Sequence, residues 1–283
     1  MPTNITPVLI LPGDIDSTDR ARNPPDYSYR VLAEGDSWFS FGSWRLQSLP
    51  RHLRFSKDTL IVTLAEPGDT ITRMSIIAKN PALEMQLTNQ SGQKWDAILL
   101  SGGGNDLIDN AGAIIPASTR QQSASKAPEE YCNLNVLRGT LTAVARGYTR
   151  IVELRDRARI SPCIGKPIIT HTYDHCTPRD APARFAFLTQ GPWLFPAMRA
   201  AKIPEDRWND VADFIMDSLA ERLLGLAQTL PNFHVVETRG ATVRAASGAK
   251  GDSNDSENEI HLTKGGCRKV AARISARLEA LLP

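Results

Sequence analysis

The sequence predicts an α/β protein in which helices cover both faces of a parallel sheet. Short apolar runs alternate with longer helical patterns along the chain, which is the order expected when helices connect parallel strands. In addition, the runs Leu60–Val62 and Ala97–Leu100 are apolar at every position and end at polar residues. Continuous apolar runs of this length are typical of strands that are buried on both faces.

The order of the elements follows from these patterns. Strands are expected at about 29–35, 58–65, 96–102, 166–173 and 232–237. Apolar residues recurring every three or four positions predict helices that contain Leu134 to Ile151 and Trp208 to Leu230, and a last helix after Thr263. Pro204 lies near the start of the second helix, where a missing N–H is harmless. Asn133 and Thr263 are predicted N-caps.

The 283 residues are interpreted as one domain preceded by a short arm. Residues 1–28 are rich in Pro, Asp and Asn and are expected to be irregular, whereas 29–283 form a single domain. Insertions are expected near 111–130 and 174–203. Together they are a candidate lid, and the second contains Trp193.

Composition excludes some partners. With 33 basic and 31 acidic residues the net charge is +2, so neither nucleic acid nor an anionic membrane is an expected partner. The apolar run Val8–Leu11 is too short for a secretory signal or a membrane span. We therefore expect a cytoplasmic protein by default, with export by another route left open. The oligomeric state is not indicated.

The turn after the first expected strand carries the strongest functional signal. Ser37 follows Glu34-Gly35-Asp36 at the carboxyl end of that strand, where open α/β sheets bind their ligands. A serine there is a candidate nucleophile, and His261, just before the last helix, is a candidate general base. The backbone N–H groups of Gly68 and Ser37 and the side-chain amide of Asn105 are candidate donors to an oxyanion.

Each of these residues also has a structural interpretation. Ser37 alone is more typical of a helix N-cap, His261 of a surface histidine, and Gly68 of a turn. Asn105 and Asp106 are also candidate caps of the helix that follows them, and for Asp106 this interpretation is favoured. The catalytic hypothesis therefore depends on all four signals occurring together and in order.

Together, the segments Gly35-Asp36-Ser37, Gly68, Gly103-x-Asn105-Asp106 and His261 resemble the sequence blocks of the SGNH hydrolases, also called the GDSL esterase/lipase superfamily. The blocks span residues 35–261 in the family's order. The resemblance implies a flavodoxin-like three-layer αβα sandwich with a central parallel sheet of about five strands. It also implies a serine ester hydrolase that forms an acyl-enzyme on Ser37 and needs no metal or organic cofactor.

One position departs from the family pattern. SGNH enzymes usually carry Asp three residues before the histidine, where this chain has Asn258. An asparagine carbonyl can accept a hydrogen bond from imidazole but carries no charge. We favour Asn258 or a backbone carbonyl as sufficient to orient His261. Two alternatives remain: the enzyme is impaired, or a nearby carboxylate substitutes, from Asp252, Asp255, Glu257 or Glu259.

Aromatic residues near the predicted site suggest a substrate pocket. Trp38, His171 and Tyr173 are expected to line it, and Phe39, Phe41 and Trp44 are further candidates, although packing is an equally good interpretation of the tryptophans and phenylalanines. The substrate class is left open among small-molecule, lipid and carbohydrate esters.

Two other functions compete with ester hydrolysis. One is a catalytically silent binding protein on the same fold, which the presence of Asn258 favours. The other is a metal-dependent phosphoesterase that uses Asp36, Asn105, Asp174 and His261. His171, Asp174 and His175 are spaced as ligands on a helix would be, but they lie at a strand end and in a loop, so metal binding is not expected there.

Overall fold

A computed structural model describes residues 4–40, 48–88, 91–157, 163–185 and 188–283. Its main element is a six-stranded sheet in the order β1-β3-β2-β4-β5-β8, in which every neighbouring pair is parallel. The strands are β1 (Val8–Ile10), β2 (Tyr29–Gly35), β3 (Thr59–Thr63), β4 (Ala97–Ser101), β5 (Ile168–His171) and β8 (Phe233–Val236).

The five expected strands are confirmed, but the expectation that residues 1–28 are irregular is wrong at Val8–Ile10. These three residues pair with Leu60–Val62 and form the edge of the sheet. A strand of this length gives too few positions for a periodic pattern, so the sequence shows only an isolated apolar run. The expected insertion 174–203 contains an antiparallel pair, β6 (Ala183–Phe185) and β7 (Leu188–Gln190).

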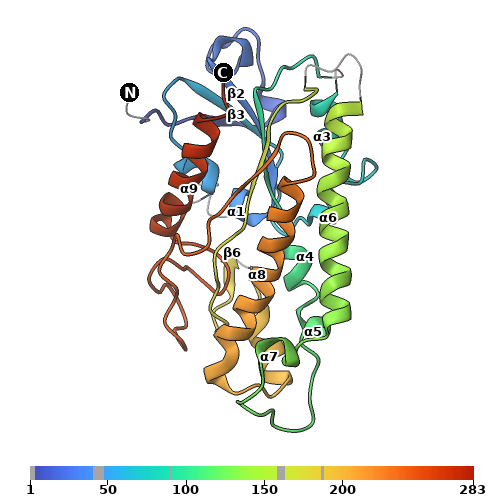
Figure 1. Cartoon of the computed structure of the whole chain (residues 1–283). Coiled ribbons are helices and arrows are strands. Elements are labelled where there is room, and N and C mark those ends of the chain that lie inside the picture. The colour runs from blue at the N-terminus through green and yellow to red at the C-terminus, as the bar shows by residue number, and fades with distance from the viewer. Residues whose placement is uncertain (1–3, 41–47, 89–90, 158–162, 186–187) are drawn as a thin grey trace.

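Helices cover both faces of the sheet, because strand residues alternate between two apolar clusters. Leu32 and Ile98 pack in the cluster that contains residues of α6 (Leu134–Arg157) and α8 (Trp208–Ala227). Their neighbours Val31 and Leu99 pack in the cluster that contains residues of α9 (Lys264–Glu279). Figure 1 shows α9 on one side of the strands and α6 and α8 on the other.

The three long helices are those predicted from apolar periodicity. The side chain of Asn133 accepts from the N–H groups of Asn135 and Val136, and that of Thr263 accepts from Gly266, so both predicted N-caps are confirmed. The shorter helices are α1 (Ser37–Ser40), α2 (Ile71–Met74), α3 (Pro81–Leu87), α4 (Gly104–Ile108), α5 (Ala111–Ile114) and α7 (Leu194–Ala200). Single 3₁₀ turns occupy Pro12–Asp14, Pro24–Asp26, Leu49–His52, Pro128–Tyr131 and Glu205–Arg207.

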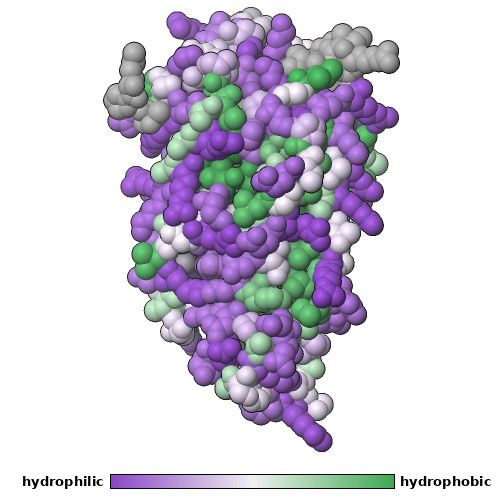
Figure 2. All heavy atoms as spheres, in the orientation of Figure 1, coloured by the Kyte–Doolittle hydropathy of each residue, from purple (hydrophilic) through white to green (hydrophobic). Residues whose placement is uncertain are grey.

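The surface in Figure 2 is mainly hydrophilic, with hydrophobic side chains gathered in a few patches on the face shown. In the part of the chain that the structure describes, no helix combines the length and apolar character needed to cross a bilayer.

The strand order places three loops beside one another. Strands β3, β2 and β4 are adjacent and parallel, so their carboxyl ends meet at one edge of the sheet. The chain passes from β3, on one side of β2, to β4 on the other. Such a reversal leaves a crevice at the strand ends, which is where α/β sheets bind ligands. The loops that begin after Gly35, Thr63 and Ser101 all open into this region.

Candidate active site

Ser37 and His261 lie side by side at this edge of the sheet. Ser37 is the first residue of α1, directly after β2, and His261 lies three residues before α9. Its Nε2 is 2.8 Å from Ser37 Oγ. The two residues are far apart in the sequence. Both are buried, with 6% of Ser37 and 3% of His261 exposed. A hydroxyl and an imidazole in this contact form the pair that nucleophilic catalysis by serine requires.

Asn258 determines which ring nitrogen of His261 carries the proton. Asn258 Oδ1 accepts hydrogen bonds from the backbone N–H groups of Ile260, at 3.1 Å, and His261, at 3.0 Å. That atom is therefore the amide oxygen, which can only accept. It also lies 2.9 Å from His261 Nδ1, so Nδ1 carries the hydrogen. Nε2 is left as the acceptor that faces Ser37, as a general base must be.

Two of the four carboxylates considered as substitutes for Asn258, Asp255 and Glu259, have other partners. Asp255 Oδ2 binds Lys269 Nζ at 2.5 Å and the backbone N–H of Val243 at 2.6 Å. Glu259 accepts from the backbone N–H groups of Trp193, Leu194 and Phe195. His261 Nδ1 instead lies 2.9 Å from Asn258 Oδ1.

Gly68 and Asn105 line one large pocket together with Ser37 and His261. The φ angle of Gly68 is +81°, a left-handed conformation that residues with a Cβ rarely adopt. Asn105 Nδ2 donates to the backbone carbonyl of Asp69 at 2.8 Å, which fixes the direction of the amide and uses one of its two hydrogens. The N–H of Ser37 is in the first turn of α1, where no partner exists within the helix.

Asp106 does not cap the helix that follows it, as the sequence analysis favoured, but a different helix. Its carboxylate accepts from the N–H groups of Ile71 and Thr72 at 2.9 and 3.3 Å, and from the Thr72 hydroxyl. These groups form the N-terminus of α2, just after the Gly68 loop. Asp106 therefore ties the loop after β3 to the turn after β4, a long-range contact that sequence spacing does not reveal.

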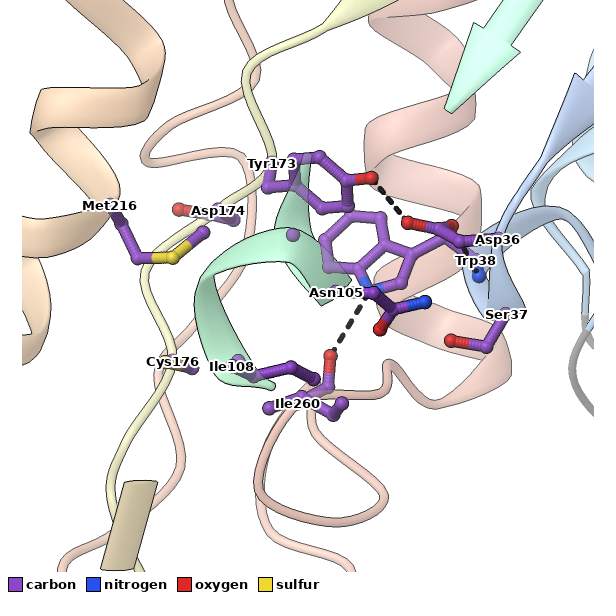
Figure 3. A pocket seen from close by; sticks show the side chains of 11 residues that line it. Asp36, Ser37, Trp38, Asn105, Ile108, Tyr173, Asp174, Cys176, Met216 and Ile260 are labelled. Atoms are coloured by element: carbon purple, nitrogen blue, oxygen red, sulfur yellow. Dashed lines mark hydrogen bonds between the residues drawn. The ribbon is translucent and has the colours of Figure 1, made fainter. Parts of the chain in front are cut away.

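A buried polar network lies beneath the nucleophile. Asp36 accepts from the Trp38 N–H at 3.0 Å, from Ser101 Oγ at 2.8 Å and from the Tyr173 hydroxyl (Figure 3). His171 Nε2 lies 3.0 Å from Ser101 Oγ, and His171 Nδ1 accepts from the Tyr173 N–H. Burial raises the pKa of Asp36 to about 6 and lowers that of His171 to about 3. The network holds the backbone on both sides of the turn that carries Ser37.

The predicted pocket residues fall in different places. Trp38 and Tyr173 line a small crevice next to Ser37, whereas His171 is fully buried and lines neither this crevice nor the large pocket. The His171 ring instead stacks on Trp38, with 5.4 Å between centroids. Phe41 and Trp44 lie outside the described residues.

Trp193, proposed from the sequence as part of a lid, lies over His261. The two rings meet edge to face with centroids 5.8 Å apart, and Trp193 lines the large pocket. Glu259, two residues before the histidine, binds three consecutive N–H groups from Trp193 onwards. Arg179, which is buried, donates to the Asn258 carbonyl at 2.6 Å. These contacts hold the insertion against the histidine loop.

Two of the side chains considered as metal ligands, those of Asp174 and His175, have protein partners. Asp174 accepts from the N–H groups of Gly240 and Thr242, and His175 lies 2.9 Å from Asp217. Among the described ranges, no three His, Cys, Asp or Glu side chains are grouped as ligands of one ion.

Comparison with known proteins gives matches among solved structures. No protein-family model and no curated protein matches the sequence. The lipase Lip_vut3 from a goat rumen metagenome superposes with a TM-score of 0.54 at 14% identity, over 88% of this chain and 96% of that one. An extracellular lipase from Streptomyces rimosus gives 0.47 at 16% identity over 88% and 99%. A family 3 carbohydrate esterase of Clostridium thermocellum gives 0.44 at 15% identity over 89% and 96%.

The parallel sheet, the helices on both faces and the match to Lip_vut3 along nearly the whole chain together determine the fold. The chain has the fold of that lipase, with helices on both faces of a parallel sheet as the sequence analysis predicted. At identities this low the likeness concerns the fold alone. The sheet has six strands where about five were expected.

Some residues around the site were not singled out from the sequence. Asp109 and Gln190 line the large pocket, and Ile108 and Met216 line the small crevice. Asp109 and Ile108 lie close to the Asn105 turn, so proximity to that block was the available signal. Gln190 and Met216 belong to no motif, and their approach to Ser37 depends on the tertiary fold.

Proposed function

We propose that this protein is a serine ester hydrolase of the SGNH type, with Ser37 as nucleophile and His261 as general base and acid. The observation that carries the proposal is the contact of 2.8 Å between Ser37 Oγ and His261 Nε2, on a ring whose other nitrogen donates to Asn258. A serine used only as a helix cap needs no such partner.

The reaction follows from these positions. Ser37 Oγ attacks the ester carbonyl carbon while Nε2 of His261 takes the Oγ proton. The carbonyl oxygen becomes an oxyanion, for which the N–H groups of Ser37 and Gly68 and the Asn105 amide are the proposed donors. The bond to the alcohol then breaks, and His261 passes its proton to the leaving oxygen. Water attacks the acyl-Ser37 intermediate in the same way and releases the acid.

The ionisation state of His261 supports its role as a base. Burial lowers its pKa to about 3, so the ring is neutral across the physiological range. Asn258 orients the ring without a negative charge that would raise this pKa. The imidazolium that forms during the reaction therefore has less stabilisation than an aspartate would give.

The test is labelling with a fluorophosphonate probe followed by peptide mapping, together with hydrolysis of 4-nitrophenyl acetate. Wild-type protein is expected to label at Ser37 and to hydrolyse the ester. Ser37→Ala should abolish labelling, and both Ser37→Ala and His261→Ala should lower kcat by roughly a thousandfold or more.

Ser40→Ala is the matched control, because Ser40 is a buried serine in the same short helix, and its Oγ donates to the Asp36 carbonyl at 2.9 Å. This variant should still label at Ser37. Full activity in Ser37→Ala, or folded wild-type protein that neither labels nor hydrolyses any ester, would contradict the proposal. The second result would indicate a silent binding protein.

A further inference from the structure

Two spaces of different size and character meet at Ser37. The small crevice is lined by Trp38, Ile108, Cys176, Met216 and Ile260, together with polar groups near Ser37 (Figure 3). Its free volume is about 30 Å³. The free volume of the large pocket is about 350 Å³. An ester bound at Ser37 must divide its acyl and alcohol parts between them.

The position of His261 decides which part lies where. The histidine that protonates the leaving oxygen must face the alcohol. His261 lines the large pocket and is not among the residues that line the small crevice, whereas Ser37 and Asn105 line both. The alcohol therefore belongs in the large pocket and the acyl group in the small crevice.

The small crevice limits the acyl chain. A cavity needs about 10–15 Å³ of such volume for one water molecule, so about 30 Å³ holds roughly two groups the size of a methyl. Ile108 from α4 and Met216 from α8 line this space, and Met216 is buried. A longer chain would require these side chains to move.

The large pocket suits a polar alcohol the size of one ring. Its volume lies in the range of ordinary small-molecule sites. Asp109 and Gln190 line it, are exposed and offer hydrogen-bonding groups. Trp193 is half-buried and adds an aromatic surface. Among the described residues that line the pocket, this mixture of an indole ring and polar groups fits a polyhydroxylated ring better than an alkyl chain.

We propose that the site cleaves esters of two- or three-carbon acids with a polyhydroxylated, ring-sized alcohol such as a sugar unit, and that Met216 and Ile108 set the limit on acyl length. This inference rests on the proposed ester hydrolase function. It predicts an enzyme for short acyl groups, although the structures it superposes on include ones described as lipases.

The first test is a series of 4-nitrophenyl esters from acetate to octanoate, assayed with the wild-type protein. Since one methylene group in an apolar pocket changes selectivity by roughly tenfold or more, kcat/KM should fall by about that factor or more between acetate and hexanoate. Acetate release from an acetylated methyl xyloside should also exceed release from hexyl acetate at equal concentration.

Variants then test the named residues. Met216→Ala and Ile108→Ala should each raise the ratio of hexanoate to acetate kcat/KM, by roughly tenfold. Met198→Ala is the matched control, because Met198 is also a buried methionine and lines neither space. Its ratio should equal that of the wild type even if the variant is less stable. Trp193→Ala should lower kcat/KM for the xyloside acetate more than for 4-nitrophenyl acetate.

The outcomes separate this inference from the function on which it rests. Equal or better hydrolysis of octanoate by a wild-type protein that labels at Ser37 would overturn the acyl limit and leave the esterase. Preference for hexyl acetate would overturn the alcohol class in the same way. An unchanged ratio in both crevice variants would remove Met216 and Ile108 from their role. Absence of any ester hydrolysis together with absence of labelling would overturn the esterase itself.

Discussion

At the scale of single residues, Asn258 is the position where this site differs most from the pattern it resembles. Its oxygen fixes the ring of His261, while its Nδ2 is buried and donates to none of the residues that the structure describes. A buried donor without a partner costs about 1–3 kcal/mol. Asn258 thus orients the base but supplies no charge, at some cost in stability.

Asn258→Asp should change the pH dependence of catalysis. A carboxylate beside Nδ1 favours imidazolium and typically raises a neighbouring pKa by about 1–3 units. The acid limb of the kcat/KM profile for 4-nitrophenyl acetate should therefore move to higher pH, and kcat at pH 8 should rise because the imidazolium of the transition state is stabilised.

Asn258→Ala is the informative control for this prediction. It removes the acceptor at Nδ1, so kcat should fall while the acid limb does not move to higher pH. An acid limb that stays in place in Asn258→Asp would show that position 258 does not govern the ionisation of His261.

Sequence reasoning reached residues that belong to short ordered blocks and missed those that only the tertiary fold brings in. Ser37, Gly68, Asn105 and His261 could be singled out because each lies at the end of a predicted strand or before a predicted helix. Trp193 could be placed no further than a candidate lid, since its distance from His261 depends on how the insertion folds back.

At the scale of elements, the link between α2 and the β4 turn holds the Gly68 loop. Asp106 supplies this link through the N-terminus of α2, whereas Thr70 caps the same helix locally by accepting from the Arg73 N–H at 3.2 Å. Both contacts serve one short helix, but only the first connects it to the strand that precedes Asn105.

Asp106→Ala should therefore impair catalysis as well as stability. It leaves the buried N–H groups of Ile71 and Thr72 unsatisfied, which should lower the free energy of unfolding by about 1–3 kcal/mol, and it frees the Gly68 loop, so that kcat for 4-nitrophenyl acetate falls. Thr70→Ala should cost about 0.5–2 kcal/mol with little change in kcat. Urea unfolding and steady-state kinetics measure the two effects, and equal kcat in both variants would contradict the link.

The elements themselves were largely predictable because hydrophobic periodicity directly reflects burial. The strands buried on both faces and the three long helices satisfy this condition. Strand β1 and the hairpin β6–β7 do not, since each of their strands has three residues. The helix that Asp106 caps was predicted incorrectly for a related reason, because the partner is 35 residues away and contact at that separation leaves no local pattern.

At the scale of the whole molecule, buried carboxyl groups and buried histidines act in opposite directions on the dependence of stability on pH. Burial raises the pKa of Glu34 and Glu259 from 4.5 to about 7. These folded-state pKa values lie above the unfolded ones, so the contribution of the two carboxyl groups to stability is lost as the pH rises from about 4.5 to 7. Burial lowers the pKa of His171 and His261 from 6.5 to about 3, so their contribution is lost as pH falls from 6.5 to 3.

The two effects oppose each other between about pH 4.5 and 6.5, and Asp36, whose pKa burial raises from 3.8 to about 6, adds a third carboxyl group to the first effect. The free energy of unfolding should therefore fall slowly as the pH rises through this window. Below about pH 3.8 these three carboxyl groups are largely protonated in both states, so the histidines prevail and stability should fall towards pH 3. Urea unfolding at half-unit pH intervals measures this profile.

Two substitutions should change that slope in opposite directions. Glu34→Gln removes one carboxyl, so the slope of the free energy of unfolding against pH should become more positive than in the wild type, by up to about 1.4 kcal/mol per unit. His171→Asn removes one histidine, so the slope should become more negative by up to the same amount. The change in slope is the measured quantity, and it is independent of how much each variant is destabilised overall. Changes of the same sign in both variants would refute the opposition of carboxyl groups and histidines.

The separation of Ser37 and His261 along the chain has a consequence for the order of folding. They are 224 positions apart, and the contact between them closes a loop that contains most of the sheet. Contacts between distant segments form late, because the entropy of the intervening chain must first be lost. During refolding, helical and sheet signals should therefore recover before any turnover, and enzymatic activity reports the completion of the fold.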